Sequence, residues 1–113
     1  MPDPATLPPS IHRVLETVLY VDDLTLAEQF YGEVLGLTLH SKRRGSFVFF
    51  RVGNSMLLLF DPTSSSEGNS LPAHGSQGAG HACFAVDEGE LERWAERLMR
   101  HGVTIEHRHD WPR

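Results

Sequence analysis

The chain contains a single cysteine, Cys83, among its 113 residues. An internal disulfide needs two cysteines, so a disulfide-stabilised scaffold is excluded and a reducing cytoplasm is the predicted location. The proline-rich first ten residues contain no apolar stretch that could serve as an export signal. No apolar run approaches the ~20 residues that cross a bilayer, so we expect no membrane association.

Basic residues are also few. Ten Lys and Arg stand against fifteen Asp and Glu, which gives a net charge of −5, and the only basic cluster is Lys42–Arg44. A phosphate backbone requires a concentrated positive surface, so nucleic acid is excluded as a partner. The length is that of one domain with a single modest hydrophobic core.

The distribution of proline and glycine divides the chain. Residues 1–12 are predicted to form a disordered arm because Met1–Ser10 contains four prolines. Residues 13–113 are predicted to form one domain. Within it, residues 61–80 are rich in Ser, Gly and Pro, which is typical of a linker between two units.

The first unit, residues 14–60, has the pattern of a strand, a helix and three strands. Residues 14–21 fit a strand, and Thr25 with Glu28 forms a possible capping box at the start of a helix that ends before Gly36. Strands are predicted over residues 37–42, 46–52 and 55–60. Gly53-Asn54 predicts a tight hairpin between the last two.

The second unit, residues 81–113, repeats the beginning of the first. It reads HACFAVDE where the first reads ETVLYVDD, and HGVTIE where the first reads LGLTLH. We therefore predict a strand over residues 81–86, a helix ending before Gly102 and a strand over residues 103–107. Self-similarity of this kind indicates a duplicated structural unit. One apolar stripe runs along the predicted helix: Leu91, Trp94, Ala95, Leu98 and Met99.

Strand alternation makes Glu16 and His81 equivalent positions in the two units. Side chains two residues apart point to the same face of a strand, so Tyr20 accompanies Glu16 and Cys83 accompanies His81. If the units pair about a pseudo-twofold axis, a carboxylate and an imidazole meet in one cavity. Oxygen and nitrogen donors of this kind suit Mn²⁺, Fe²⁺, Ni²⁺ or Zn²⁺.

The stretches VDDLTLAEQFYGEVLGL and GHACFAV resemble the vicinal oxygen chelate superfamily. This family includes glyoxalase I, bleomycin-resistance proteins, fosfomycin-modifying enzymes, extradiol dioxygenases and methylmalonyl-CoA epimerases. The resemblance implies an α+β fold in which two βαβββ modules form an open, cupped mixed sheet. It also implies metal ligands at Glu16 and His81. The third ligand is expected beyond Arg113, because the second module is incomplete there.

The residues leave the subgroup open. Glyoxalase I and the epimerases have a further ligand where this chain has Leu58, and the dioxygenases and fosfomycin enzymes usually have histidine where it has Glu16. We expect a divalent-metal-dependent enzyme acting on a small oxygenated molecule, with a glyoxalase-like lyase or isomerase favoured. The alternatives are a metal-free binding protein like the bleomycin-resistance proteins, an extradiol-dioxygenase-like or fosfomycin-enzyme-like member, and a remnant completed by a partner.

The remaining expectations concern the cavity and the assembly. The strand of residues 46–52 could turn either of its two alternating sets to the cavity. An incomplete second module would leave an apolar cup and an unpaired edge, so either a homodimer or further residues beyond Arg113 are expected. No catalytic residue is assigned, and His107 and His109 are interpreted as an exposed, frayed strand. No chemical role is assigned to His12, His40, His74 or His101. The candidate substrate-cavity residues are Tyr20, Phe49, Arg51, Leu58 and Cys83.

Overall fold

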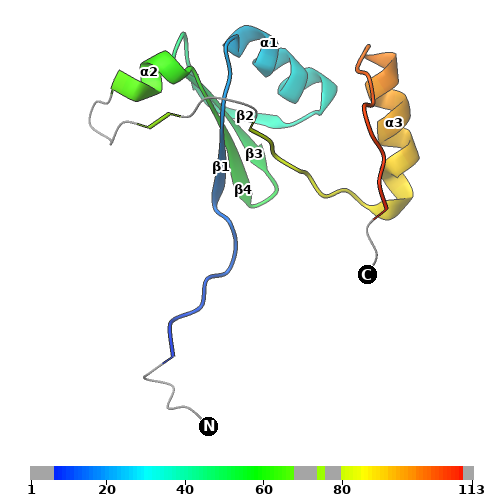
Figure 1. Ribbon diagram of the computed structural model, residues 1–113, viewed down its shortest axis with the longest axis horizontal. Coiled ribbons are helices and arrows are strands. Elements are labelled where there is room, and N and C mark those ends of the chain that lie inside the picture. Colours follow the sequence, from blue (N-terminus) through cyan, green and yellow to red (C-terminus); the bar gives the residue numbers. More distant parts are fainter. Residues whose placement is uncertain (1–6, 68–73, 76–79, 111–113) are drawn as a thin grey trace.

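The computed structural model of the chain describes residues 7–67, 74–75 and 80–110 (Figure 1). The first unit forms a four-stranded sheet covered on one face by a helix. Its elements are β1 (Glu16–Tyr20), α1 (Leu24–Gln29), the π-helical turn η2 (Phe30–Val34), β2 (Thr38–Arg43), β3 (Phe47–Val52) and β4 (Ser55–Phe60).

The sheet is open and mixed, with the strand order β1-β4-β3-β2. β1 runs parallel to β4, while β4 with β3 and β3 with β2 are antiparallel. The hairpin between β3 and β4 turns at Gly53, whose φ of 57° lies in the left-handed region that glycine adopts without steric cost. These strands occupy the predicted places, with bounds that shift by no more than two residues.

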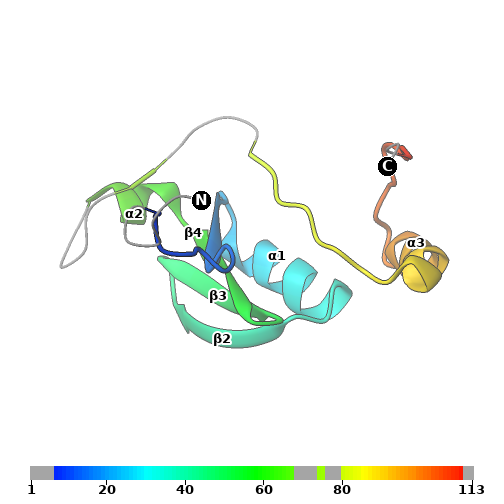
Figure 2. The same cartoon turned by 90° about the horizontal axis from the view of Figure 1, so that it is seen from below.

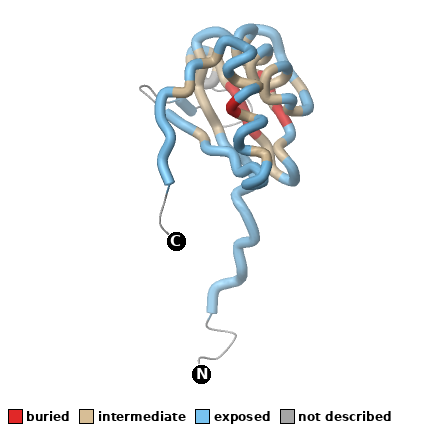
Figure 3. Tube along the Cα trace, turned by 90° about the vertical axis from the view of Figure 1, so that its right-hand side faces the viewer, coloured by how far each residue is buried: buried red, intermediate tan, exposed pale blue. Residues whose placement is uncertain are grey.

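The hydrophobic core lies between the sheet and α1. Its fully buried members come from β3 and β4, and Leu19, Ala27 and Tyr31 pack against them. Figure 3 shows how small this buried region is within the chain. Burial raises the pKa of the Tyr31 phenol above its usual value, because the ionised form is poorly solvated there. The buried cluster consists of Val48, Phe50, Leu57 and Leu59.

The N-cap of helix α1 lies two residues before the predicted N-cap, Thr25. The N-cap is Asp23, whose carboxylate Oδ1 accepts a hydrogen bond from the backbone N–H of Leu26 at 3.0 Å. The prediction of Thr25 with Glu28 as a capping box is therefore wrong. Thr25 already lies inside the helix, and the Glu28 carboxylate forms an ion pair with Lys42 Nζ at 3.0 Å. Asp23 has the extended backbone of an N-cap, which leaves its side chain free to bond forward.

Substituting the cap tests its contribution to stability. Asp23→Ala is expected to lower the free energy of unfolding by about 1 kcal/mol, because one backbone donor of the first turn loses its acceptor. Urea denaturation followed by circular dichroism measures the change. The matched control is Asp22→Ala, which removes the neighbouring exposed carboxylate. Equal losses in both variants would contradict the capping role.

The second unit contains one helix, as predicted, but its two predicted strands are absent from the described residues. A short 3-10 turn, η3 (Glu88–Glu90), leads into α3 (Leu91–Arg100). Residues 81–86 and 103–107 have no strand pairing, so the strand predictions there are wrong. In the first unit, β1 pairs only with β4 and β2 only with β3. The counterparts of β3 and β4 are not among the described residues of the second unit, so these segments have no partner for their backbone groups.

Helix α3 lies beside the end of η2, apart from the sheet (Figures 1 and 2). The Cα radius of gyration is 17.6 Å, whereas a compact domain of this length has a radius of about 13 Å. The extended N-terminal arm and this placement of α3 both enlarge the molecule. Several large apolar side chains of the second unit are exposed as a result: Phe84, Val86, Leu91 and Met99.

A further helix, α2 (Pro62–Glu67), begins inside the segment that was predicted as a linker. Asp61 Oδ1 accepts hydrogen bonds from the backbone N–H groups of Thr63 and Ser64. The dipeptide Asp61-Pro62 carried the signal for this start, because aspartate is a preferred N-cap and proline a preferred first helical residue. Among the described residues, no helix is long and apolar enough to cross a membrane.

Candidate functional site

The sheet has a second face, opposite α1, which we call the cup face. It is defined by the pairing register, since paired residues on neighbouring strands share a face. Tyr20 pairs with Phe60 and Phe60 pairs with Phe47. Because Val48 and Phe50 are buried in the core, Phe47, Phe49 and Arg51 are the set of β3 residues on the cup face. The cup face comprises Glu16, Val18, Tyr20, Phe47, Phe49, Arg51, Met56, Leu58 and Phe60.

Aromatic rings cover one end of the cup face. Phe47 and Phe49 are stacked with ring centroids 4.2 Å apart, and Phe49 meets Phe60 edge to face at 5.4 Å. Tyr20 lies 6.4 Å from Phe60 in a tilted arrangement. Leu58, between these rings in the register, is only 8% exposed. The rings are half-buried, so this end of the face offers an apolar surface for planar groups.

His74 lies against this aromatic end although the sequence assigned it no role. Its ring stands edge-on to Phe60 with centroids 4.5 Å apart, and its Nδ1 is 2.8 Å from the Tyr20 hydroxyl oxygen. The residue comes from the segment predicted as a linker. No local pattern marks it, because its position depends on how the chain returns to the sheet after α2.

Glu16 and His81, the predicted metal ligands, are both exposed. Glu16 begins β1, about 13 Å along the strand from Tyr20. His81 follows Gly80, which lies near the core-facing Leu19. A Cβ atom placed on Gly80 would be 3.9 Å from Leu19 Cδ2. Neither side chain makes a hydrogen bond or ion pair with another described residue.

The described residues do not form a complete metal centre. They contain no group of three or more His, Cys, Asp and Glu side chains that could hold a metal ion. Glu16 and His81 are chemically suitable as one oxygen and one nitrogen donor, but two ligands leave an ion weakly held. A metal bound by this pair would need a further donor from outside the described residues.

The other two candidate cavity residues differ in their placement. Arg51 lies on the cup face, paired with Met56, and is exposed. Cys83 is a free, exposed thiol in the segment that leads to η3, and the register of the sheet does not include it. The structure thus gathers Tyr20, Phe49, Arg51 and Leu58 on the face that carries Glu16.

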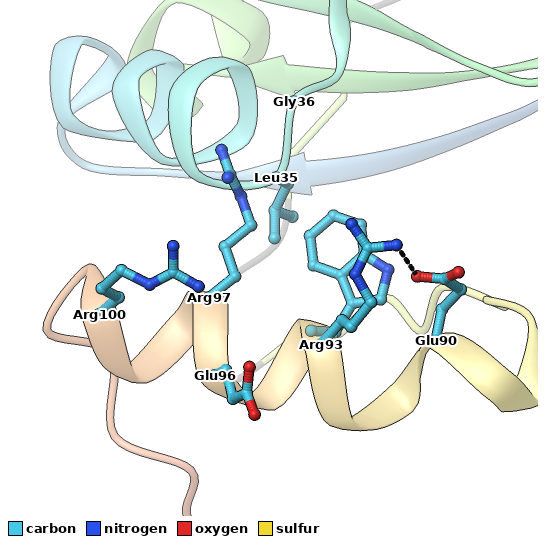
Figure 4. A pocket seen from close by; sticks show the side chains of 8 residues that line it. Leu35, Gly36, Glu90, Arg93, Glu96, Arg97 and Arg100 are labelled. Carbon is cyan, nitrogen blue, oxygen red and sulfur yellow. Dashed lines mark hydrogen bonds and ion pairs between the residues drawn. The ribbon is translucent and has the colours of Figure 1, made fainter.

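A cavity of about 410 Å³ lies elsewhere, between the end of η2 and α3 (Figure 4). Arg97 reaches across it and donates from Nε to the Val34 carbonyl oxygen at 2.7 Å and from Nη2 to that of Glu33 at 2.9 Å. These bonds satisfy carbonyl groups at the end of η2 and attach the second unit to the first. The lining residues are Leu35, Gly36, Glu90, Arg93, Trp94, Glu96, Arg97 and Arg100.

Removing this attachment should loosen α3. Arg97→Ala is expected to lower stability by about 1–2 kcal/mol, since two charge-assisted hydrogen bonds are lost from a partly solvated position. Amide hydrogen exchange of residues 91–100 measures the effect locally. Arg100→Ala is the control. It removes another guanidinium of the same helix, one that makes no hydrogen bond to the described residues. Equally fast exchange in both variants would rule out a specific role for Arg97.

The sequence matches the family model of the Glyoxalase/Bleomycin resistance protein/Dioxygenase superfamily over residues 11–111. The chain belongs to this superfamily. The match spans both units and the segment between them. No curated protein matches the chain significantly.

Solved structures agree with this assignment. A lactoylglutathione lyase from Agrobacterium tumefaciens is 46% identical, with a TM-score of 0.85 over 94% of this chain and 81% of that one. A glyoxalase/bleomycin resistance protein/dioxygenase from Nocardioides is 25% identical, with a TM-score of 0.68 over 96% and 74%. The fosfomycin resistance protein FosX from Listeria monocytogenes shares the fold at 19% identity, with a TM-score of 0.62 over 92% and 74%. The α+β fold with an open mixed sheet is thus confirmed as that of the superfamily.

Proposed function

We propose that this superfamily member is a glyoxalase-like lyase that depends on a divalent metal. The observation that carries the proposal is the 46% identity to a lactoylglutathione lyase across 94% of the chain. The substrate class that follows is a thioester of a 2-hydroxy acid, or the isomeric hemithioacetal of an oxoaldehyde. Both have oxygen atoms on two adjacent carbons.

Interconversion of these isomers moves one proton from one of these carbons to the other and a second proton between their two oxygens. No external oxidant or reductant is needed. A divalent metal, when bound, would act as a Lewis acid for the two neighbouring oxygens. Glu16 and His81 are the residues of this chain that we propose as its ligands, with a further donor from outside the described residues. Mn²⁺, Fe²⁺, Ni²⁺ and Zn²⁺ all suit such a donor set.

Different parts of the cup face have different roles in this proposal. Its aromatic end would bind the apolar part of the substrate and exclude water. Arg51, exposed beside Met56, would attract a carboxylate of the thiol portion, because its guanidinium is not paired with a described acidic group. Cys83 remains a candidate cavity residue without an assigned task.

We also propose that two copies associate in the cytoplasm. The exposed apolar side chains of the second unit, Phe84 and Met99 among them, favour this assembly because a partner would remove them from water. Sedimentation of the purified chain tests it. A stable monomer at all concentrations would contradict the proposal.

The activity test uses the hemithioacetal of methylglyoxal and glutathione. Ultraviolet absorbance measures thioester formation. We expect this activity to disappear after treatment with EDTA and to return with at least one of the four metals. Absence of turnover with every metal, or turnover unaffected by EDTA, would refute the proposal. A metal-free binding function like that of bleomycin resistance proteins is the second candidate. The aromatic end of the cup face favours it, because apolar surface binds ligands without an ion.

A further inference from the structure

The aromatic end of the cup face contains one polar contact that the proposed metal chemistry does not use. The Tyr20 hydroxyl and His74 Nδ1 are 2.8 Å apart, and the imidazole also contacts the Phe60 ring. Two segments separated by 54 positions thereby meet at the end of β1. Such a contact holds His74 over the sheet.

The hydrogen bond selects one form of the neutral imidazole. Nδ1 and the hydroxyl could each be the donor, but an imidazole nitrogen is a more basic acceptor than a phenol oxygen, and a phenol is the more acidic donor. We therefore assign Tyr20 as the donor to Nδ1, which leaves the proton of the neutral imidazole on Nε2. Among the described residues, this Nε2–H has no hydrogen-bond partner.

The His74 side chain is exposed, so its Nε2–H meets solvent beside the half-buried aromatic rings, where a bound ligand would replace water as the acceptor. Binding pockets combine apolar surface, which supplies affinity, with a few polar groups that fix the orientation of the ligand. Here the stacked Phe47 and Phe49 rings and the Phe60 edge supply the surface. The Nε2–H of His74 supplies the polar group, and Tyr20 holds its direction.

We propose that His74 is a specificity-determining residue of this protein. Together with Tyr20, it forms a subsite for a planar apolar group that carries a hydrogen-bond-accepting oxygen, such as an aromatic ring bearing a carboxylate or carbonyl. The subsite lies about 13 Å along β1 from Glu16, so it recognises a part of the substrate remote from that end. This inference rests on the proposed function in one respect: the molecule bound at the subsite is a substrate only if the protein is the proposed lyase.

The test compares two small probes of the subsite that differ in one group and are too short to reach Glu16. Mandelate has a phenyl ring where lactate has a methyl group, and both have the same carboxylate and hydroxyl. Calorimetric titrations of the full chain in EDTA should show mandelate binding about tenfold more tightly than lactate, because only mandelate covers the aromatic rings. Equal affinities in the parent protein would overturn the proposal.

Variants then separate His74 from the rings. His74→Ala should weaken mandelate binding about tenfold through loss of a hydrogen bond to a charged group. Tyr20→Phe should give a smaller loss, because it keeps the ring and removes only the orienting hydroxyl. His40→Ala is the control, since the one hydrogen bond that this exposed histidine makes within the described residues is to its neighbour Ser41. If His74→Ala binds mandelate as tightly as the parent, the assignment is wrong.

One further measurement excludes a merely structural role. Nitrogen-15 chemical shifts of the His74 ring should show the Nε2–H form in the parent and a mixture of both forms in Tyr20→Phe. An unchanged spectrum would also contradict the proposal. Because all titrations are done without metal, failure of the lyase assay leaves this result intact. If the lyase assay succeeds but the parent protein binds mandelate and lactate equally in the titrations, the subsite alone is refuted.

Discussion

Phe50→Ala is expected to lower the free energy of unfolding by about 3–5 kcal/mol, the largest loss in stability that we predict for one substitution. Phe50 is 1% exposed in the middle of β3. Its ring lies 6.2 Å from that of Tyr31, and a Cβ at Gly32 would be 3.4 Å from its Cε1. Truncation would therefore leave a cavity between the sheet and the helical layer that neighbouring groups cannot fill.

The size of this effect matters because the core is small. Domains are commonly stable by only about 5–15 kcal/mol, so the loss would be a large fraction of the total. Urea denaturation measures it, with Phe84→Ala as the control because that ring is 37% exposed. If Phe50→Ala does not fold, Phe50→Leu should still fold with a loss of about 1 kcal/mol. A loss for Phe84→Ala as large as that for Phe50→Ala would contradict the position of the core.

The second large effect concerns the proposed metal ligands. Glu16→Gln and His81→Ala are each expected to weaken divalent-metal binding by more than about 100-fold. Changes to outer-shell groups alone commonly cost 10–100-fold, and a lost ligand costs at least as much. Calorimetric titration with Mn²⁺, Fe²⁺, Ni²⁺ and Zn²⁺ measures the affinities. The conservative Glu16→Gln substitution retains the shape of the side chain and removes its charge.

The control is His101→Ala, which removes an exposed histidine at the end of α3. It should leave metal affinity unchanged. If the parent binds none of the four metals, or if both ligand variants bind as tightly as the parent, metal-free sequestration of a ligand becomes the better account of the protein. Glu16 and His81 would then be ordinary exposed residues.

Local patterns were sufficient to predict the four strands of the first unit and the helix between the first two. Successive side chains of a strand point to opposite faces, which places Leu57 and Leu59 of β4 on one face and Leu58 on the other, in agreement with the pairing register. The predicted helix ends at Gly36 and Gly102 are also confirmed, since both glycines have a positive φ where their helices end. These features depend on residues close in sequence, so the sequence alone was enough to determine them.

Three other features depended on contacts between distant residues. Residues 81–86 have a strand pattern but no partner strand among the described residues, and a strand exists only when its backbone groups are paired. His74 meets Tyr20 across 54 positions, and Arg97 meets Val34 across 63. No periodicity encodes these contacts, because each joins residues that are more than 50 positions apart in the sequence. The sequence therefore determined the strands of the sheet and the facing of β1 and β4, while the tertiary structure decided which side of β3 lines the cup face and which residues of the later segments contact the first unit.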